Sequence, residues 1–387
     1  MLSTHQKVQG KSIHVNTLTE MIHHQRTELL NNVLYDIVLS HQEVKLKENL
    51  GPRYKRMKVM ASFDCPFCSG CYFIRKGKRM RVYKSVLGRS KIPILQVQCV
   101  HCGHRFCPYK DSIGLLFKER ISQALKERQL KLTCHLSYKK ARGFIQSCLG
   151  ISLSAMTIRK EIDRQADRIR SKPVSASGEI VYDDSTRVKA GSKERGVSIH
   201  LAVTAKPGKI ISGRNTMIKR LLFLKTGHAK TIKETLKSLK AKGIVHDGDM
   251  DLTGCAPLVQ RCLWHLVHQL KHFLWLDGLP HQEKEPYVKE LIDILFGSRT
   301  VQIMKEQYQN FLEKLKTSQL FNSFGHLKHA QNEIATSREN RFDYHTTSPV
   351  EREMREINRR ADIGVRWSVA GIENLLLVKT YLAMNKP

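Results

Sequence analysis

The sequence predicts a multidomain protein in which a helical arm, a small cysteine-rich β domain and a helical hairpin precede a larger α/β domain. Three observations lead to this fold class. A length of 387 residues is too long for one average domain. Six of the ten cysteines fall within residues 62–109, and the apolar period changes from helical to strand-like after a linker at 172–178. Apolar residues form 41% of the chain, which is enough for a large core and excludes a disordered protein.

The charge balance predicts a nucleic-acid partner. Lys and Arg number 66 against 35 Asp and Glu, which gives a formal net charge of +31. A modest excess would fit any basic soluble protein. An excess of this size favours a polyanion, because neutralised phosphates release condensed counterions.

No stretch of the chain looks like a targeting or membrane segment. The apolar stretch at 29–39 is short and is interrupted by Asn31, Asn32 and Asp36, so it does not resemble a signal peptide. No run approaches the roughly 20 apolar residues of a membrane span. We therefore expect a cytoplasmic, nucleoid-associated protein with no membrane partner. In that reducing compartment the ten cysteines predict metal ligands or buried thiols rather than disulfides.

The first two regions are predicted at residues 1–60 and 61–110. Residues 1–60 are basic and carry apolar residues at helical spacing, which predicts a helical arm and nothing further. Residues 61–110 contain two CxxC pairs with 30 residues between them and a basic, strand-like stretch at 79–84. Two such pairs at tight turns supply the four thiolates of a structural Zn²⁺ ribbon, and Gly103 relaxes the second turn. The predicted zinc ligands are Cys65, Cys68, Cys99 and Cys102.

Alternatives remain open for this zinc site. Cys71, His101, His104 and Cys107 lie close enough in the sequence to replace one ligand. A cluster of buried thiols is the other interpretation, but burial does not explain two pairs with the same spacing. A ribbon of this kind is structural and often touches DNA, so we infer no catalysis from it.

Residues 111–172 are predicted to form a helix-turn-helix-like DNA-binding region. Apolar residues at helical spacing over 136–145 lead to Gly150, and serines that suit a helix N-cap precede a second helical stretch from Met156. Any helical hairpin gives a similar pattern, so the DNA-reading role rests on the basic character of the chain. Arg159 and Lys160, in the second helix, are the predicted DNA contacts.

Residues 178–387 are predicted to form an α/β domain. Strand-like stretches at 179–184, 197–204 and 220–224 precede a helical stretch at 229–242 and a strand that ends at Asp247. Three strands, a helix and a strand begin an RNase H-like α/β layer. In such a sheet, acids at the ends of neighbouring central strands converge on a metal.

Three blocks of this region resemble those of the Mutator-like superfamily of DDE transposases and related bacterial insertion-sequence transposases. DST at 184–186 resembles a first block, D-x-T. Asp247, followed by QRCLWH at 260–265, resembles a second block, an acid and then QRC-x-x-H. TTSPVER at 346–352, with arginines after it, resembles a third block, T-T-N-x-x-E-R with a basic tail. The resemblance spans about residues 179–380, over half the chain.

The resemblance implies a catalytic triad of Asp184, Asp247 and Glu351. Such a triad holds two Mg²⁺ (or Mn²⁺) ions about 4 Å apart for in-line attack on a phosphodiester, first by water and then by a DNA 3′-OH. By this analogy Asp184 bridges the two ions, and each other acid binds one. It also implies an all-α insertion at about 252–343, where 288–295 and 301–315 carry apolar helical stripes.

The sequence departs from the family pattern at two places. Ser348 and Pro349 stand where the family often has Asn and another residue, and the interval from Asp247 to Cys262 looks short. Neither departure removes a carboxylate, but both leave the subfamily open.

Each acid also has another interpretation. Asp183 could replace Asp184, because alternation along a strand lets only one of them face the site. Asp247, with the two acids that follow at alternate positions, could form a cation-binding loop or a solvated turn. Glu351 fits a capping box with Ser348 at the N-cap and Pro349 next to it, and Glu353 could take its catalytic place.

Two further groups belong to the same resemblance. Cys262 and the helix face of His265, His268 and His272 could bind zinc, but packing or a DNA contact is the favoured role. The second group is predicted to line the DNA path beside Glu351, with a solvated basic face as the alternative: Arg352, Arg355, Arg359 and Arg360.

The sequence-based hypothesis is an active transposase that acts on double-stranded DNA, both transposon ends and target. Synapsis of two ends implies at least a homodimer. The alternatives are a non-enzymatic DNA-binding regulator derived from a transposase and an RNase H-like nuclease without strand transfer.

Overall fold

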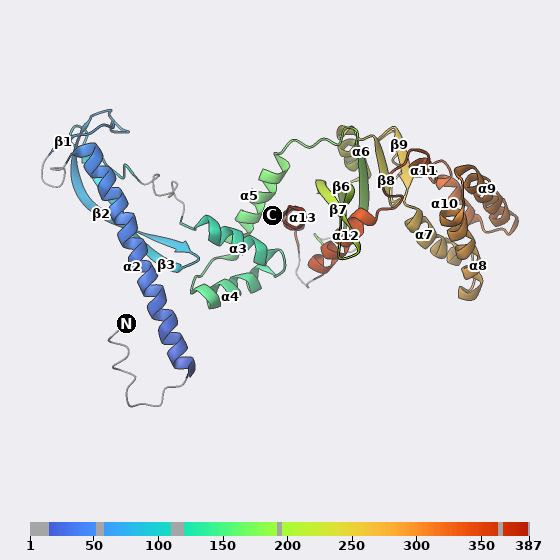
Figure 1. Ribbon diagram of the computed structural model, residues 1–387, viewed down its shortest axis with the longest axis horizontal. Coiled ribbons are helices and arrows are strands. Elements are labelled where there is room, and N and C mark those ends of the chain that lie inside the picture. Colours follow the sequence, from blue (N-terminus) through green and yellow to red (C-terminus); the bar gives the residue numbers. More distant parts are fainter. Residues whose placement is uncertain (1–14, 52–57, 110–119, 192–195, 363–366, 386–387) are drawn as a thin grey trace. The chain divides into compact units, whose positions relative to one another are not determined.

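The computed structural model describes residues 15–51, 58–109, 120–191, 196–362 and 367–385 (Figure 1). Of the predicted helical arm at 1–60, residues 1–14 and 52–57 lie outside these ranges. The fold is mixed α/β and about half helical, which confirms the predicted class at that level. The chain divides into two compact units, residues 1–158 and residues 159–387. Among the described helices none is both long and apolar enough to cross a membrane.

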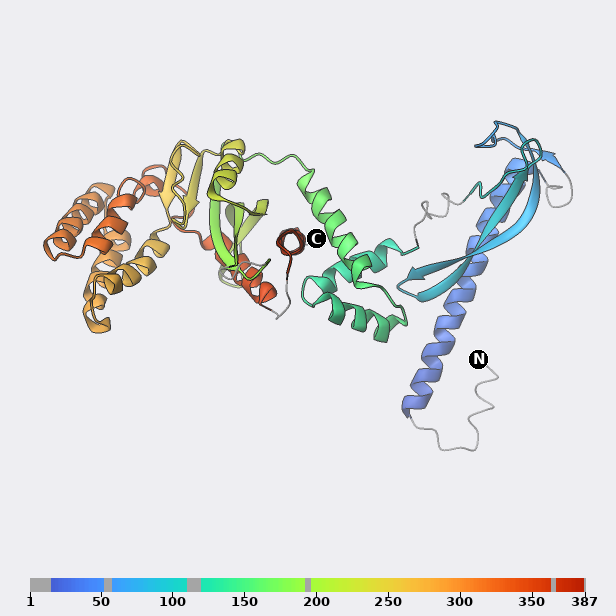
Figure 2. The ribbon, with the colours of Figure 1, turned by 180° about the vertical axis from the view of Figure 1, so that it is seen from behind.

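The first unit combines one long helix with a small antiparallel sheet (Figure 2). Helix α2 spans Val15–Leu50. The sheet has the order β1-β2-β3-β4, and β2 and β3 form its long hairpin. The strands are β1 (Val59–Met60), β2 (Tyr72–Ser85), β3 (Gly88–Cys99) and β4 (Arg105–Phe106).

Apolar packing and one buried amide fix α2 on this sheet. Leu46 and Leu50 of α2 are buried in the same core as Phe73 of β2. The Gln42 side chain donates from Nε2 to the Pro93 carbonyl (2.8 Å) and accepts at Oε1 from the Leu95 N–H (3.0 Å). These bonds satisfy an amide that is only 1% exposed.

Three helices follow the sheet: α3 (Gln123–Thr133), α4 (Tyr138–Leu149) and α5 (Ala155–Arg170). Helix α4 ends at Gly150, whose φ of 62° is the left-handed conformation that glycine adopts freely. The Ser154 hydroxyl accepts a hydrogen bond from the Thr157 N–H at the start of α5 (3.0 Å). The predicted pair of helices with a glycine turn and a serine cap is therefore present.

The second unit begins inside α5 and not at the predicted linker. The Asn374 amide donates to Asp163 (2.8 Å) and Arg170 pairs with Glu373 (2.8 Å), so the later turns of α5 bind α13 (Val369–Met384). The linker at 172–178 was predicted from local composition. These contacts join residues about 200 positions apart, so local composition cannot reveal them. The unit boundary therefore differs from the composition boundary.

The second unit contains a five-stranded sheet with the order β7-β6-β5-β8-β9. Strands β5, β6 and β7 are antiparallel neighbours, while β5, β8 and β9 run parallel. Helix α6 (Ala229–Ser238) connects β7 to β8. The strands span Ile180–Val188, Val197–Ile211, Arg214–Thr226, Gly243–His246 and Leu258–Arg261.

The two faces of this sheet carry different helices. Ile232 and Leu236 of α6 pack on the face that presents Val181 of β5. Helix α12 (Ser348–Ala361) contacts the other face, where the Thr186 hydroxyl hydrogen-bonds to Asn358 (3.0 Å). Because side chains alternate along a strand, Asp183 faces the α6 side and Asp184 the α12 side.

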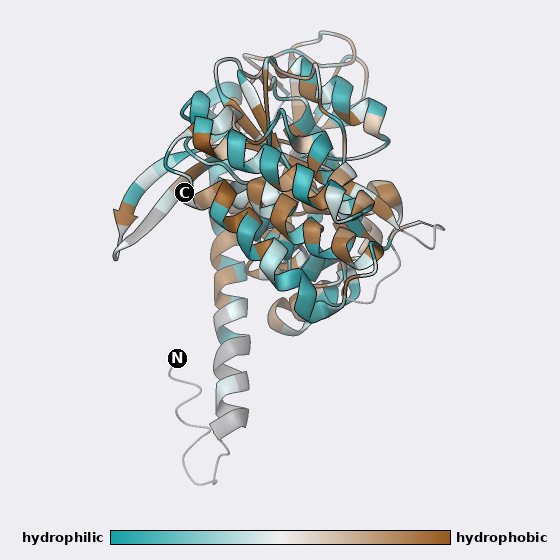
Figure 3. Ribbon diagram, turned by 90° about the vertical axis from the view of Figure 1, so that its right-hand side faces the viewer, coloured by the Kyte–Doolittle hydropathy of each residue, from teal (hydrophilic) through white to brown (hydrophobic). Residues whose placement is uncertain are grey.

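A helical insertion separates β9 from α12 and has its own core, which includes Leu266, Met304 and Phe311. In Figure 3 the insertion faces the viewer, and apolar and polar residues alternate along its helices, as amphipathic packing requires. The predicted apolar stripes lie in α8 with the adjoining turn η2 and in α9. The insertion elements are α7 (Leu263–Leu276), α8 (His281–Ile292), η2 (Asp293–Gly297), α9 (Val301–Thr317), α10 (Phe321–Ala330) and α11 (Thr336–Glu339).

Candidate active site and metal centre

Two of the three predicted acids lie side by side. Asp184 belongs to β5 and Asp247 directly follows β8; the parallel register that pairs Asp183 with His246 makes them neighbours. The Ser185 backbone N–H donates to Asp184 Oδ1 (2.9 Å) and to Asp247 Oδ2 (3.1 Å). Each acid is only 6% exposed. The sheet therefore holds two carboxylates at one buried point.

The electrostatics of this pair suit a cation. Burial, followed by the charge of Asp247, raises the pKa of Asp184 to about 8. Two neighbouring carboxylates out of water repel each other unless a proton or a cation offsets their charge. Hard carboxylate oxygens are the ligands that Mg²⁺ and Mn²⁺ prefer. The donor set therefore fits a divalent metal.

Two acids after Asp247 have different roles. The Ser185 hydroxyl lies 3.2 Å from Asp247 Oδ2 and 2.5 Å from Asp249 Oδ2, so Asp249 joins the same polar cluster. Asp251 instead accepts from the Thr253 N–H (2.9 Å) and is exposed. The solvated-turn interpretation therefore fits Asp251 alone. In the sequence, nothing except its place in the run of acids at 247, 249 and 251 pointed to Asp249.

Asp183 occupies the opposite face from Asp184. It is 1% exposed, and its Oδ2 lies 3.8 Å from His200 Nδ1. Burial raises the pKa of Asp183, and the nearby His200 imidazole opposes that shift. The strand alternation thus turns Asp184, and not Asp183, toward the α12 side of the sheet.

Glu351 lies in the first turn of α12, the helix that packs against β5. The capping-box alternative is wrong, because the N-cap is Thr347 instead of Ser348 and its side chain makes no capping bond. Glu353 pairs with Lys219 of β7 (2.9 Å), which gives it a structural role.

The Glu351 carboxylate does not share a single tight ligand group with the acid pair. Among the described residues, Asp184, Asp247 and Glu351 do not all place ligand atoms within 4.8 Å of one another. Two metals about 4 Å apart distribute their ligands over two coordination spheres. The acid pair therefore fits one cation. Glu351 lies on α12, the helix that contacts the strand of Asp184.

Cys262 and His265 hold the start of α12. The Thr347 N–H donates to Cys262 Sγ (3.3 Å), and the Thr347 hydroxyl lies 3.2 Å from His265 Nδ1. Burial lowers the pKa of His265, but its contact with Cys262 and the nearby acids raises it to about 9. These residues form no metal-ligand group with other described residues. These contacts fit packing, one of the two roles that the sequence favoured, and they join the start of α7 to the turn before Glu351.

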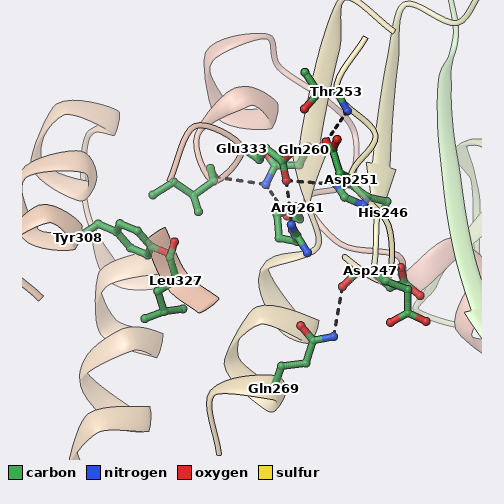
Figure 4. A network of polar contacts seen from close by, with 12 residues as sticks. His246, Asp247, Asp251, Thr253, Gln260, Arg261, Gln269, Tyr308, Leu327 and Glu333 are labelled. Atoms are coloured by element: carbon green, nitrogen blue, oxygen red, sulfur yellow. Dashed lines mark hydrogen bonds and ion pairs between the residues drawn. The ribbon is translucent and has the colours of Figure 1, made fainter. Parts of the chain in front are cut away.

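The residues before Cys262 form a second polar layer (Figure 4). Arg261 Nε donates to Glu333 Oε2 (3.1 Å), and His246 Nε2 lies 3.2 Å from the same oxygen. Gln260 accepts from the Ser337 N–H (2.7 Å), which ties β9 to the segment before α12. Strand β9 and Glu333 escaped the sequence prediction, because the strand is short and half polar and the acid lies over 70 residues away.

Gly248 permits this layer, and an alanine substitution tests it. Its φ is +97°, and a Cβ there would lie 1.6 Å from Arg261 Nη1. Gly248→Ala should displace Arg261 from Glu333 and cost about 3 kcal/mol or more beyond backbone strain. We expect a fall of about 6 °C or more in the thermal midpoint of the second unit.

Gly254→Ala is the matched control for this prediction. Gly254 also has a positive φ (+74°), but a Cβ there meets nothing within 4 Å. It should lose only the backbone term of about 1–2 kcal/mol. Equal losses in the two variants would show that the contact with Arg261 carries no stability.

A second cluster contains the four predicted cysteines. The Sγ atoms of Cys65, Cys68, Cys99 and Cys102 all lie within 4.8 Å of one another. Two of the separations are 3.6 Å. A tetrahedral zinc with Zn–S bonds of about 2.3 Å requires sulfur atoms about 3.8 Å apart. The cluster is therefore compatible with a structural zinc site.

The turns around this cluster repeat one geometry. Ser69 and Gly103, each directly after the second cysteine of a pair, have φ values of 56° and 72°. A Cβ on Gly70 would approach two of the sulfur atoms at 3.4 Å. Of the alternative ligands, His104 stacks on the Phe67 ring (4.5 Å between centroids). The described metal-ligand group contains none of them.

The predicted DNA-contacting arginines of α12 divide by exposure. Arg352, Arg355 and Arg359 are exposed and share one helix face at spacings of three and four. The prediction that Arg360 contacts DNA is wrong. Its side chain is 2% exposed and lies over the Trp367 ring at 4.9 Å, so it does not reach solvent. One position along a helix turns a side chain by about 100°, which takes Arg360 into the core.

The two predicted contacts in α5 are solvent-accessible. Arg159 lies 3.7 Å from Asp163, one turn along the same helix, and Lys160 is exposed. Both side chains are therefore available to a partner.

Comparison of the chain with protein-family models and with curated protein sequences gives no match.

Proposed function

We propose that this protein is a DDE transposase that cleaves and joins DNA strands of an insertion element with bound divalent metal. The observation that carries the proposal is the buried Asp184–Asp247 pair at neighbouring strands of the central sheet. The sheet supports an RNase H-like domain, with three antiparallel strands, a crossover helix and a parallel strand. Because one fold serves many functions, the acid pair weighs more than the fold.

Each residue of the site has a defined task in this proposal. Asp184 and Asp247 would hold the metal at the sheet, and Glu351 would add a carboxylate from the first turn of α12. When bound, Mg²⁺ would supply charge stabilisation to the attacking and leaving oxygens of the phosphodiester. The Cys262–Thr347 contact would keep Glu351 at a fixed distance from the sheet.

DNA binding would come from basic surfaces on both units. Arg352 and Arg355 are exposed on α12, in the same turns as Glu351, and have no ion-pair partner among the described residues. The cysteine cluster and the α4–α5 hairpin, with Arg159 and Lys160, would bind the element's ends. Double-stranded DNA suits a chain of net charge +31. Pairing of two ends would need at least two copies of the chain.

The affinity for Mg²⁺ should depend on pH. The Asp184 carboxyl, with its pKa of about 8, keeps its proton at neutral pH in the metal-free protein and must release it to a cation. Mg²⁺ affinity should therefore rise up to about tenfold per pH unit as pH approaches 8, and level off above it. The raised pKa also means that metal-free stability falls as pH rises through about 8.

The Mg²⁺-induced rise in thermal midpoint, measured from pH 6 to pH 9, checks this dependence. Asp184→Asn removes the titrating group and should abolish both the rise and its pH dependence. A Mg²⁺ effect of equal size at pH 6 and pH 8.5 in the natural protein would contradict the assignment.

One assay tests the proposed function. Purified full-length protein is incubated with Mg²⁺ and the genomic DNA that flanks its gene. Cleavage at element ends with joining to target DNA is the expected result. Cleavage without joining would indicate an RNase H-like nuclease instead. A salt-sensitive shift of the DNA with neither reaction would indicate a regulator.

A further inference from the structure

Helix α7 carries an exposed stripe of aromatic side chains. Trp264 and Trp275 are 44% and 60% exposed, although the chain has only three tryptophans. Large apolar side chains that gather at the surface mark interaction sites. We call the following four residues the α7 stripe: Trp264, His268, His272 and Trp275.

The stripe occupies one face of the helix. Its spacings of four, four and three keep the rings within one turn's width, over a length of about 16 Å. The rings contact each other in pairs, with centroids 5.1 Å apart for Trp264 and His268 and 5.7 Å for His272 and Trp275. The opposite face, with Leu266 and Leu270, is buried in the core of the insertion. The stripe is therefore not needed for that core.

The charge around the stripe suits an anion. Helix α7 contains no Asp or Glu, and Lys271 is exposed between the two histidines of the stripe. The nearest acid along the chain, Asp277, follows the helix and accepts hydrogen bonds from Asn322 and Ser323. Exposed aromatic rings beside a cation are a platform for nucleic-acid bases above a phosphate chain.

Helix α7, which carries the stripe, lies against the site. Trp264 directly precedes His265, whose Nδ1 lies 3.2 Å from the Thr347 hydroxyl at the start of the helix that carries Glu351. Further along α7, Gln269 Nε2 reaches the Asp247 carbonyl at 3.5 Å (Figure 4). The stripe therefore lies on a helix that contacts the backbone of the acid pair.

We propose that the α7 stripe binds single-stranded DNA by stacking unpaired bases beside the site of strand cleavage. A duplex hides the faces of its bases within its own stack, so rings of this kind engage only bases that have left it. This inference rests on the proposed function for the origin of the unpaired strand. The binding itself needs no cleavage.

The test measures binding of the full-length, zinc-loaded protein without Mg²⁺. Fluorescence anisotropy compares a labelled 20-nucleotide oligo(dT) with a 20-base-pair duplex. The double variant Trp264→Ala/Trp275→Ala should bind oligo(dT) about 10-fold or more weakly and the duplex with less than about 2-fold change. The variant Trp264→Phe/Trp275→Phe keeps the rings and should stay within about 3-fold of the natural protein. Phe321→Ala, an aromatic 62% exposed on α10, is the control for lost surface area.

Three results would overturn the proposal. The first is an alanine variant that binds oligo(dT) as well as the natural protein does. The second is equal weakening for oligo(dT) and duplex. An alanine variant that changes from dimer to monomer in sedimentation, with oligo(dT) affinity intact, would also overturn it and assign the stripe to a contact between copies.

The assay also separates this inference from the proposed function. Tryptophan-dependent binding without any cleavage in Mg²⁺ would leave the stripe in place and remove the transposase proposal. Cleavage with tryptophan-independent binding would do the reverse.

Discussion

Asp184→Asn and Asp247→Asn should each lower Mg²⁺-dependent DNA cleavage by at least about 1,000-fold. Asparagine keeps the shape of aspartate but removes the charge that would hold the cation. Both acids are 6% exposed, so no water shell replaces the lost ligand. The initial rate of cleavage on an end-labelled fragment measures the loss. DNA binding, measured as a salt-sensitive shift, should not change.

The thermal stability of Asp184→Asn should exclude misfolding as the cause of its lost cleavage. Burial and the charge of Asp247 raise the pKa of Asp184 to about 8, so the charged carboxylate destabilises the metal-free fold. Asp184→Asn removes this penalty, and its thermal midpoint above pH 8 without Mg²⁺ should equal or exceed that of the natural protein. An inactive but more stable variant points to lost chemistry.

Matched variants locate the effect. Asp251→Asn changes an exposed acid in the same loop and should keep full activity. Glu351→Gln should lose activity, whereas Glu353→Gln should keep it and lose stability, because Glu353 pairs with Lys219. Cleavage retained by Asp184→Asn, or lost equally in Asp251→Asn, would refute the assignment of the acid pair.

The sequence predicted the part of this site that depends on local pattern. Apolar runs that end in an acid predicted Asp184 and Asp247 at strand ends. Asp247 does directly follow β8, whereas β5 continues to Val188 and Asp184 lies inside it; the parallel register of β5 and β8 still makes the two acids neighbours. The partners of the second layer are different. Glu333 reaches Arg261 from over 70 residues away, and no period or spacing in the chain connects them.

Local rules failed where a distant partner competes. The segment at 348–351 fits a capping box, but the N-cap position falls one residue earlier, at Thr347. The Thr347 side chain makes no capping bond, because its hydroxyl is engaged by Cys262 and His265. In the same helix, a run of arginines looked uniformly exposed. Arg360 instead lies over Trp367, because helical rotation turns it into the core. In both cases a contact with a side chain outside the local sequence pattern decides the position of the residue.

Removal of the metal from the cysteine cluster should unfold the sheet of the first unit. Cys65 and Cys99 are 2% and 1% exposed and pack in one core with Phe73 and Leu46. Structural zinc supplies roughly 10–16 kcal/mol of apparent binding energy to small domains, more than such a domain gains from its own core. Cys65→Ser or Cys99→Ser should therefore lose one bound zinc per chain and the thermal transition of this unit.

Two controls make this prediction specific. Cys148→Ser changes an exposed thiol outside the cluster and should keep both the zinc and the transition. The transition of the second unit should not move in Cys65→Ser, because its core is built from other residues, among them Val181 and Ile232. Full zinc content in Cys65→Ser would show that the cluster is not the metal site. Loss of duplex affinity with the acid pair's Mg²⁺ response intact would show that DNA binding depends on the metal-held fold, separately from the cleavage chemistry.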